Sequence, residues 1–379
     1  MGAYIALIGI TIVSYFLFYY QSINKGIKAS YSTNYSGSVL LRTDKVEAKT
    51  ITVFFVIYIL LLGLRNINVG IDTRSYINSY FYKLMGVDWG YLFEYTADEI
   101  GFSVLTKIIS MISGSTQFYL FVLAVVSVMP IAYLYRKEAK DALLCCSFFL
   151  ISLLFEAFFS ALREGVAIGL VAPAYYFTKR KQLIPFILTV VFASIFHLSA
   201  LIVLLLYPVY HTKLRFRRLW IIAPLMFIVY RYNDIIFDTL LVNMGGKYAS
   251  KYLTYGYNET GQFGLLFLFI LIFAYCFIMM DESKADDDDL GLRSVLVLAT
   301  MLQFFAPLHV MASRMNYYFI VFIPLALTRT NYRCRRLFRQ VAIIARYTMI
   351  AFFIFYFFFM KGDSLQIMEY SFFFQEGWR

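Results

Sequence analysis

The chain has 379 residues, of which 61% are hydrophobic, 20% aromatic and only 15% charged. This composition excludes an ordinary soluble globular enzyme, because water cannot solvate a surface built from so many apolar side chains. The net charge of +11 would also suit nucleic-acid binding. However, the Lys and Arg residues gather between apolar runs, as they do in the cytoplasmic loops of membrane proteins. The sequence therefore predicts a polytopic membrane protein with no nucleic-acid partner.

Twelve apolar runs predict an all-α transmembrane bundle of about twelve helices. They cover residues 3–20, 50–64, 116–135, 142–160, 162–178, 183–196, 198–210, 219–231, 263–280, 293–310, 315–328 and 341–360. A bilayer core needs roughly 17 to 25 apolar residues per helix, so the shorter runs are expected to be tilted, kinked or re-entrant. No domain boundary or repeat stands out, which favours a single integral membrane domain over residues 1–379.

The distribution of basic residues predicts which connections face the cytoplasm. If the odd-numbered connections do so, most Lys and Arg residues lie inside and both chain termini lie outside. Two long outer loops follow, residues 65–115 and 232–262. Within the first, residues 100–113 show apolar residues at helical spacing, which predicts an interfacial helix. The acidic run at 286–289 falls in a short inner connection and is expected to be a solvated loop rather than a metal site.

Charged side chains where the second apolar run ends indicate a first candidate site. A charge inside a span is costly, so ionisable residues at such places suggest function. Arg65 and Arg74 could clamp a phosphate, because guanidinium groups match phosphate oxygens in pairs. Asp72 could orient them or take a proton. The alternative is that they are interface arginines beside a turn carboxylate.

Three further polar positions fall on the same predicted outer side. Arg163 occupies a tight hairpin between two apolar runs, where it either lines an anionic cavity or forms a local ion pair with Glu164. His197 lies where two short helices meet, facing that cavity or bonded to a neighbouring helix. Arg314 adds another cation or an interface anchor. Together with the first site they suit a pyrophosphate on a lipid.

The order of short motifs resembles a known family. The motifs are Gly70-x-Asp72-x-x-x-Tyr76, Glu99-Ile100-Gly101-Phe102, Arg163 before an Ala/Gly-rich helix, Phe196-His197-x-Ser199-Ala200, and Arg314 with Tyr317 and Tyr318. Over residues 50–330 this pattern resembles the EpsG/Wzy-like family of bacterial polysaccharide polymerases. One departure is Ile100, where the pattern has Pro.

The resemblance implies a multi-pass glycosyltransferase of the bacterial inner membrane with a fold similar to the GT-C class. Such an enzyme joins oligosaccharide repeat units carried on undecaprenyl pyrophosphate at the periplasmic or outer face, building O-antigen, capsule or exopolysaccharide. The partners expected are the lipid-linked donor and acceptor, membrane lipids and, optionally, a chain-length regulator. Arg163 and His197 match the intramembrane Arg and His of such proteins, while Arg65, Asp72 and Arg314 match outer-loop positions.

This chemistry requires no metal or other cofactor, because a lipid pyrophosphate is already a good leaving group. The chain must supply cations for the developing charge, for which Arg65, Arg163 and Arg314 are the candidates. It must also supply a base for the acceptor hydroxyl. His197 is ranked first, because an imidazole accepts protons near neutral pH. Behind it come two carboxylates, Asp72 and Glu99.

Three tyrosines of the second outer loop, Tyr252, Tyr255 and Tyr257, are expected to hold a glycan and set acceptor specificity; the alternative is a solvated interfacial helix. Two other functions stay open. A lipid-linked oligosaccharide transporter or flippase would also want a cationic cavity, although no repeated halves are visible. An O-antigen ligase would share the pyrophosphate site and differ in its acceptor.

Overall fold

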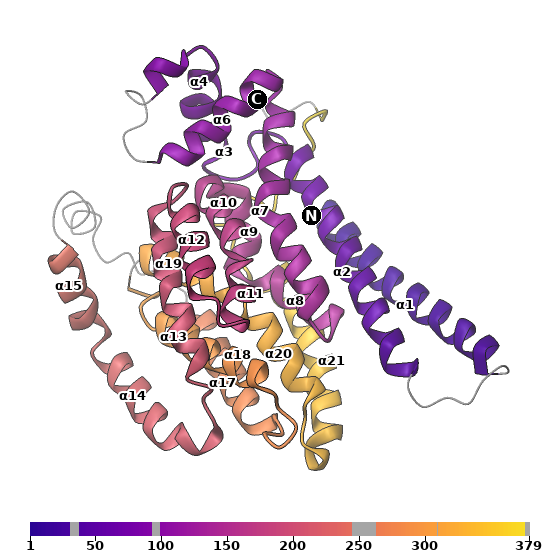
Figure 1. Cartoon of the computed structure of the whole chain (residues 1–379). Helices are drawn as coiled ribbons and strands as arrows, with labels where there is room; N and C mark the ends of the chain where they lie inside the picture. Colours follow the sequence, from indigo (N-terminus) through magenta and orange to yellow (C-terminus); the bar gives the residue numbers. More distant parts are fainter. Residues whose placement is uncertain (31–37, 93–98, 245–262, 309, 376–379) are drawn as a thin grey trace. The chain divides into compact units, whose positions relative to one another are not determined.

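The computed structural model describes residues 1–30, 38–92, 99–244, 263–308 and 310–375 (Figure 1). Every named element in these ranges is a helix, and the β-type pairing there consists of two isolated bridges, Arg65 with Phe372 and Met280 with Cys334. The predicted all-α class is therefore confirmed. The chain divides into two compact units, residues 1–201 with 345–379 (unit 1) and residues 202–344 (unit 2).

Unit 1 contains the helices from the N-terminus to the middle of the chain and the C-terminal end. They are α1 (Gly2–Ser30), α2 (Ser38–Leu64), α3 (Thr73–Tyr76), η1 (Ile77–Tyr82), α4 (Lys83–Met85), η2 (Trp89–Tyr91), α6 (Ile100–Ile112), α7 (Thr116–Glu138), α8 (Ala142–Ile151), α9 (Leu153–Ser160), α10 (Leu162–Val171), α11 (Ala174–Lys179), α12 (Leu183–Ser194), most of α21 (Arg339–Phe355) and η6 (Tyr356–Met360). Helix α2 packs between α1 and α7, and α10 packs on α7. The short helices α3, α4 and α6 lie together at one end of the unit (Figure 1).

Unit 2 is built around α18. Its elements are the second half of η3 (Leu198–Leu205), α13 (Leu206–His211), η4 (Phe216–Arg218), α14 (Leu219–Arg231), α15 (Asn233–Met244), α17 (Phe263–Met279), α18 (Asp287–Gln303), α19 (Val310–Ile320), α20 (Ile323–Tyr332), η5 (Arg336–Phe338) and the start of α21. Helices α13, α17, α19 and α20 all pack against α18.

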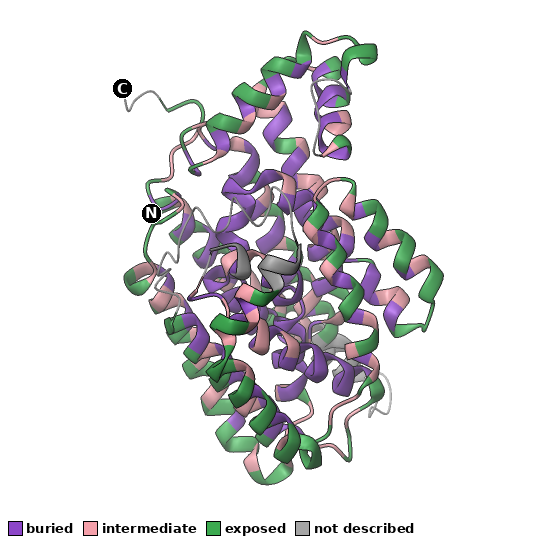
Figure 2. Ribbon diagram, turned by 90° about the vertical axis from the view of Figure 1, so that its left-hand side faces the viewer, coloured by how far each residue is buried: buried purple, intermediate pink, exposed green. Residues whose placement is uncertain are grey.

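Within the described ranges, four helical stretches are long and apolar enough to cross a bilayer, namely Gly2–Asn24, Asp44–Leu64, Thr116–Glu138 and Arg336–Met360. The count rises to six if two bent pairs each form one span. These pairs are α8 with α9, bent by 59°, and α14 with the first part of α15, bent by 70°. Exposed residues run along entire helices, as expected where helices face lipid (Figure 2). The protein is membrane-embedded, and the bends agree with the expectation that some apolar runs are kinked.

The acidic run at 286–289 is not the solvated loop predicted from the sequence. Asp286 caps the N-terminus of α18 in a capping box with Asp289. Asp288 and Asp289 are buried, and arginines at the end of α20 neutralise them. Arg329 lies 2.6 Å from Asp288, and Arg333 lies 3.1 Å from Asp289. The prediction was wrong because the sequence did not show that these basic residues would reach the helix start.

Candidate functional site

His197 lies at a break in the apolar run that follows Lys181, between α12 and η3. Its backbone N–H donates to the Ala193 carbonyl at 3.2 Å, which closes α12, and its own carbonyl accepts from the Ala200 N–H at 3.0 Å. The imidazole is 21% exposed and pairs through Nδ1 with the carboxylate of Glu99. No described residue bonds to Nε2. The contact through Nδ1 therefore orients the ring and leaves Nε2 available to a ligand.

Glu99 joins this histidine to an arginine. It occupies the N-cap position of α6, but its side chain does not cap the helix. One carboxylate oxygen meets His197, and the other lies 2.7 Å from Nη1 of Arg163. The side chain is only 11% exposed. In such a partly dry setting, charge-assisted contacts are stronger than neutral hydrogen bonds, so the carboxylate holds both partners in place.

A close backbone approach brings Glu99 to His197. The Gly101 N–H donates to the Ile195 carbonyl at 3.0 Å, and a Cβ on Gly101 would lie 3.0 Å from the carbon and oxygen of that carbonyl. A larger residue would crowd this carbonyl, so glycine favours the close contact. Ile100 is the first residue of α6, a position where proline is also favoured, so the departure from the family pattern leaves the helix start intact.

Arg163 lies in the first turn of α10, and two tyrosines hold its side chain in place. Its Nη1 donates to the Tyr80 hydroxyl at 2.8 Å and its Nε to the Tyr76 hydroxyl at 3.3 Å. The guanidinium carbon also lies over both rings, 5.6 Å from the centroid of Tyr76 and 5.4 Å from that of Tyr80. Burial raises the pKa of the Tyr76 hydroxyl, which keeps it protonated. No described residue bonds to Nη2 of Arg163, which therefore remains available to a ligand.

The role of these tyrosines was missed by sequence reasoning. Tyr76 ends α3, and Tyr80 lies in η1, a π-helical turn of the kind often found at functional sites. Both rings pack on Phe102 of α6, with centroids 5.8 and 5.4 Å away. Tyr76 and Tyr80 are four residues apart in the stretch after Asp72, and this helical spacing is the signal that could have placed them on one shared face.

Arg65 is buried and stabilises the turn before α3, so it does not face a ligand. It is 1% exposed and donates to the carbonyls of Leu62 at 3.1 Å and Phe159 at 2.9 Å. The Thr73 hydroxyl donates to the same Phe159 carbonyl at 2.9 Å. A Cβ on Gly70, whose φ is +93°, would lie 2.5 Å from that oxygen. This turn is thus fixed to the end of α9, and the expected pyrophosphate contact of Arg65 is not accessible in this structure.

The C-terminal segment is hydrogen-bonded to the same turn. The N–H groups of Asn66, Gly70 and Ile71 donate to carbonyls of residues 371, 366 and 365 at 2.9 to 3.0 Å. The sequence carries no signal for this pairing, because about three hundred residues separate the two segments. These hydrogen bonds help to fix the turn that precedes α3, the helix that ends at Tyr76.

The remaining predicted residues do not join this cluster. Asp72 is half-buried at the start of α3, where its carboxylate caps no backbone N–H, and Arg74 is exposed and donates to Asn68 at 2.5 Å. Arg314 lies within α19 of unit 2, half-buried and with no ion pair to a described residue. Tyr252, Tyr255 and Tyr257 lie outside the described residues. The cluster that the structure assembles is Glu99, Arg163 and His197 with the two tyrosines.

Comparison with known proteins places the chain in a family. The model of the EpsG family matches residues 49–372, which include the whole cluster. No curated protein and no solved structure matches the chain. Within the part of the chain that the structure describes, no group of three or more His, Cys, Asp or Glu side chains could hold a metal ion. Because the family match covers most of the chain, this protein belongs to the EpsG family.

Proposed function

We propose that this protein is a membrane glycosyltransferase that polymerises oligosaccharide repeat units carried on undecaprenyl pyrophosphate. EpsG-family membership points to a polysaccharide polymerase-type membrane protein. The observation that carries the finer proposal is the carboxylate of Glu99 set between Arg163 and His197. This arrangement offers a base, a group that orients the base, and a cation within one cluster.

His197 acts as the base in this proposal. Its free Nε2 takes the proton from the acceptor hydroxyl as the oxygen forms a bond to the anomeric carbon of the donor sugar. The bond from that carbon to the pyrophosphate breaks, and the lipid pyrophosphate leaves with the electron pair. Glu99 fixes the imidazole through Nδ1 and stabilises the imidazolium that forms.

Arg163 meets the charge that develops on the leaving pyrophosphate. Two tyrosines and one carboxylate fix its guanidinium before the substrate binds, so little reorganisation is needed during the reaction. Its side chain is 28% exposed, and its Nη2 makes no hydrogen bond to a described residue. Asp72 and Arg74, on the neighbouring turn, are secondary candidates for contact with the substrate. Further contacts proposed outside this cluster are Arg314, Tyr252, Tyr255 and Tyr257.

The proposed setting is the bacterial inner membrane, with the site at the periplasmic or outer face and both termini on that side. The excess of Lys and Arg in the opposite connections supports this orientation. The proposal keeps the expectation of about twelve crossings, in which short apolar helices such as α12 and α17 add to the longer spans, and of a GT-C-like fold. A chain-length regulator is an optional partner.

The test is the surface-polymer ladder of a deletion strain complemented with wild type, Arg163→Ala or His197→Ala at matched membrane levels. A full ladder with wild type and single-unit products with the deletion and both variants would support the proposal. A deletion strain that loses all surface glycan would instead indicate export or ligation. A full ladder from both variants would show that the cluster only stabilises the fold.

A further inference from the structure

Unit 2 contains a cavity that is separate in sequence from the Glu99 cluster. Its volume is about 390 Å³, within the range of small-molecule pockets. It is lined by the end of α14, the start of α15, the start of α17 and the segment after α18. The lining residues are Tyr230, Arg231, Asn233, Phe263, Phe304, Pro307 and Leu308. None of these has a part in the proposed glycosyl transfer.

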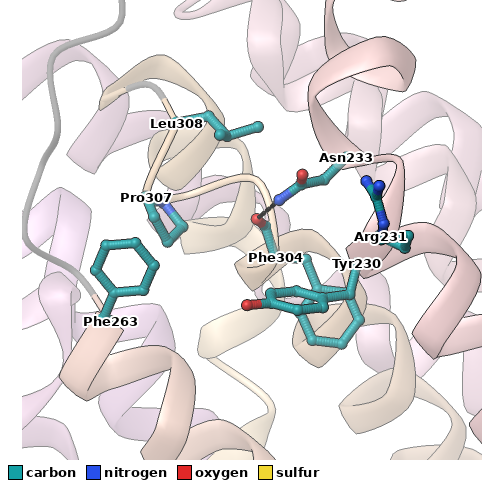
Figure 3. A pocket seen from close by; sticks show the side chains of 7 residues that line it. All are labelled: Tyr230, Arg231, Asn233, Phe263, Phe304, Pro307 and Leu308. Atoms are coloured by element: carbon teal, nitrogen blue, oxygen red, sulfur yellow. Dashed lines mark hydrogen bonds between the residues drawn. The ribbon is translucent and has the colours of Figure 1, made fainter.

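The walls of the cavity are mostly apolar. Figure 3 shows Phe263 and Pro307 on one side and the rings of Tyr230 and Phe304 on the other. The ring centroids of Tyr230 and Phe304 are 5.5 Å apart in an edge-to-face arrangement. Aromatic and aliphatic walls of this kind favour an apolar ligand segment.

The surface around the cavity carries exposed apolar side chains, as expected for a surface that faces lipid. The cavity lies at the 70° bend of α14 and α15, a pair apolar enough to form a membrane span together. The nearby side chains of Phe227, Phe263 and Phe267 are 59 to 66% exposed. In a membrane-embedded chain such exposed apolar surface faces lipid. The ligand that reaches this cavity most readily therefore comes from the membrane.

The two polar side chains at the bend, Asn233 and Arg231, differ in whether they have partners. Asn233 donates to the Phe304 carbonyl at 2.7 Å and accepts from the Asp234 N–H at 2.9 Å, so its amide ties the bend together (Figure 3). Arg231 is exposed and lies over the Tyr232 ring at 5.5 Å. Within the described ranges it has no carboxylate partner. A full positive charge thus stands unpaired at the edge of an apolar pocket.

From this combination we propose that the cavity of unit 2 binds an acyl chain of an anionic bilayer phospholipid, with Arg231 paired to its head-group phosphate. The apolar walls take the chain, and the guanidinium fork matches phosphate oxygens. A head group with net negative charge is preferred, because a choline group would repel the arginine. This proposal concerns unit 2 alone and does not rest on the glycosyltransferase activity.

The test measures lipid retention by the full-length protein in detergent, using native mass spectrometry. The two probes are phosphatidylglycerol and phosphatidylcholine with identical acyl chains. Wild type should retain phosphatidylglycerol about fivefold more strongly, which is the approximate effect of one basic residue near an anionic surface. Arg231→Gln should abolish that preference. Arg217→Gln removes an equal charge from an exposed position outside the cavity lining and should retain it.

A second variant separates loss of the pocket from loss of charge. Leu308→Trp fills the cavity without altering charge, and it should reduce phosphatidylglycerol retention while the thermal unfolding temperature in phosphatidylcholine stays near that of wild type. Equal retention of both lipids by wild type, or retention unaffected by either cavity variant, would overturn the proposal. Selective retention of a polyprenyl phosphate over phosphatidylglycerol would overturn it as well, since the cavity would then belong to the substrate.

Discussion

Replacing Glu99 by Gln tests the central feature of the proposed mechanism while preserving side-chain shape. The change removes the negative charge that lies 2.7 Å from Arg163 and that pairs with His197. A hydrogen bond to a charged group contributes about 1.5 to 3 kcal/mol. If the contact with the imidazolium is lost in the transition state, this corresponds to a rate about 10- to 150-fold lower. Added misorientation of the ring brings the expected loss to about a hundredfold or more.

The assay is transfer of repeat units from purified lipid-linked donor to acceptor by wild type and Glu99→Gln in the same detergent. Glu138→Gln provides a matched control, because Glu138 is also largely buried at 13% exposure and pairs with Lys179 at 3.0 Å. It should keep near-normal transfer. A rate for Glu99→Gln within threefold of wild type, at equal amounts of folded protein, would refute the role of this carboxylate.

Three further substitutions test how the site is supported. Gly101→Ala should destabilise the protein by about 1 to 3 kcal/mol and slow transfer at least tenfold, because the added Cβ would lie 3.0 Å from the Ile195 carbonyl. Thermal unfolding and the transfer rate measure the two effects. The control is Gly9→Ala, which should change neither, because the space around its Cβ position is open. Arg65→Met should lower the unfolding temperature but leave the donor KM of the folded fraction unchanged, whereas a raised KM would restore a substrate contact for Arg65. Lys361→Met should cost about 3 to 5 kcal/mol, because it leaves the buried Glu156 carboxylate unpaired, and adding Glu156→Gln should recover part of that loss in denaturant unfolding.

The cluster depends on two backbone carbonyls at the ends of broken apolar helices. The Phe159 carbonyl accepts from Arg65 and Thr73 and thereby sets the turn before α3, which carries Tyr76. The Ile195 carbonyl accepts from Gly101 and sets the start of α6. The catalytic groups in the proposal lie within a few residues of these contacts. Unwinding the helices thus frees polar backbone groups that position the site.

Much about this protein follows from the sequence by itself. Its apolar runs require a membrane-embedded helical chain, because periodicity and composition act locally and need no tertiary partner. Arg163 and His197 could be singled out because a charge or an imidazole inside an apolar run is costly and rarely accidental. The motif order also indicated the family that the later comparison confirmed.

Only the tertiary structure decided which polar residues work together. Arg65 and Arg163 look alike in sequence, yet one is buried against carbonyls and the other keeps part of its guanidinium open. Glu99 meets His197 across 98 positions, and Tyr80 meets Arg163 across 83. Pairings over such distances depend on how helices pack and where they break, which local patterns do not encode. The same reason explains why the acidic start of α18 proved to be a buried ion-pair network.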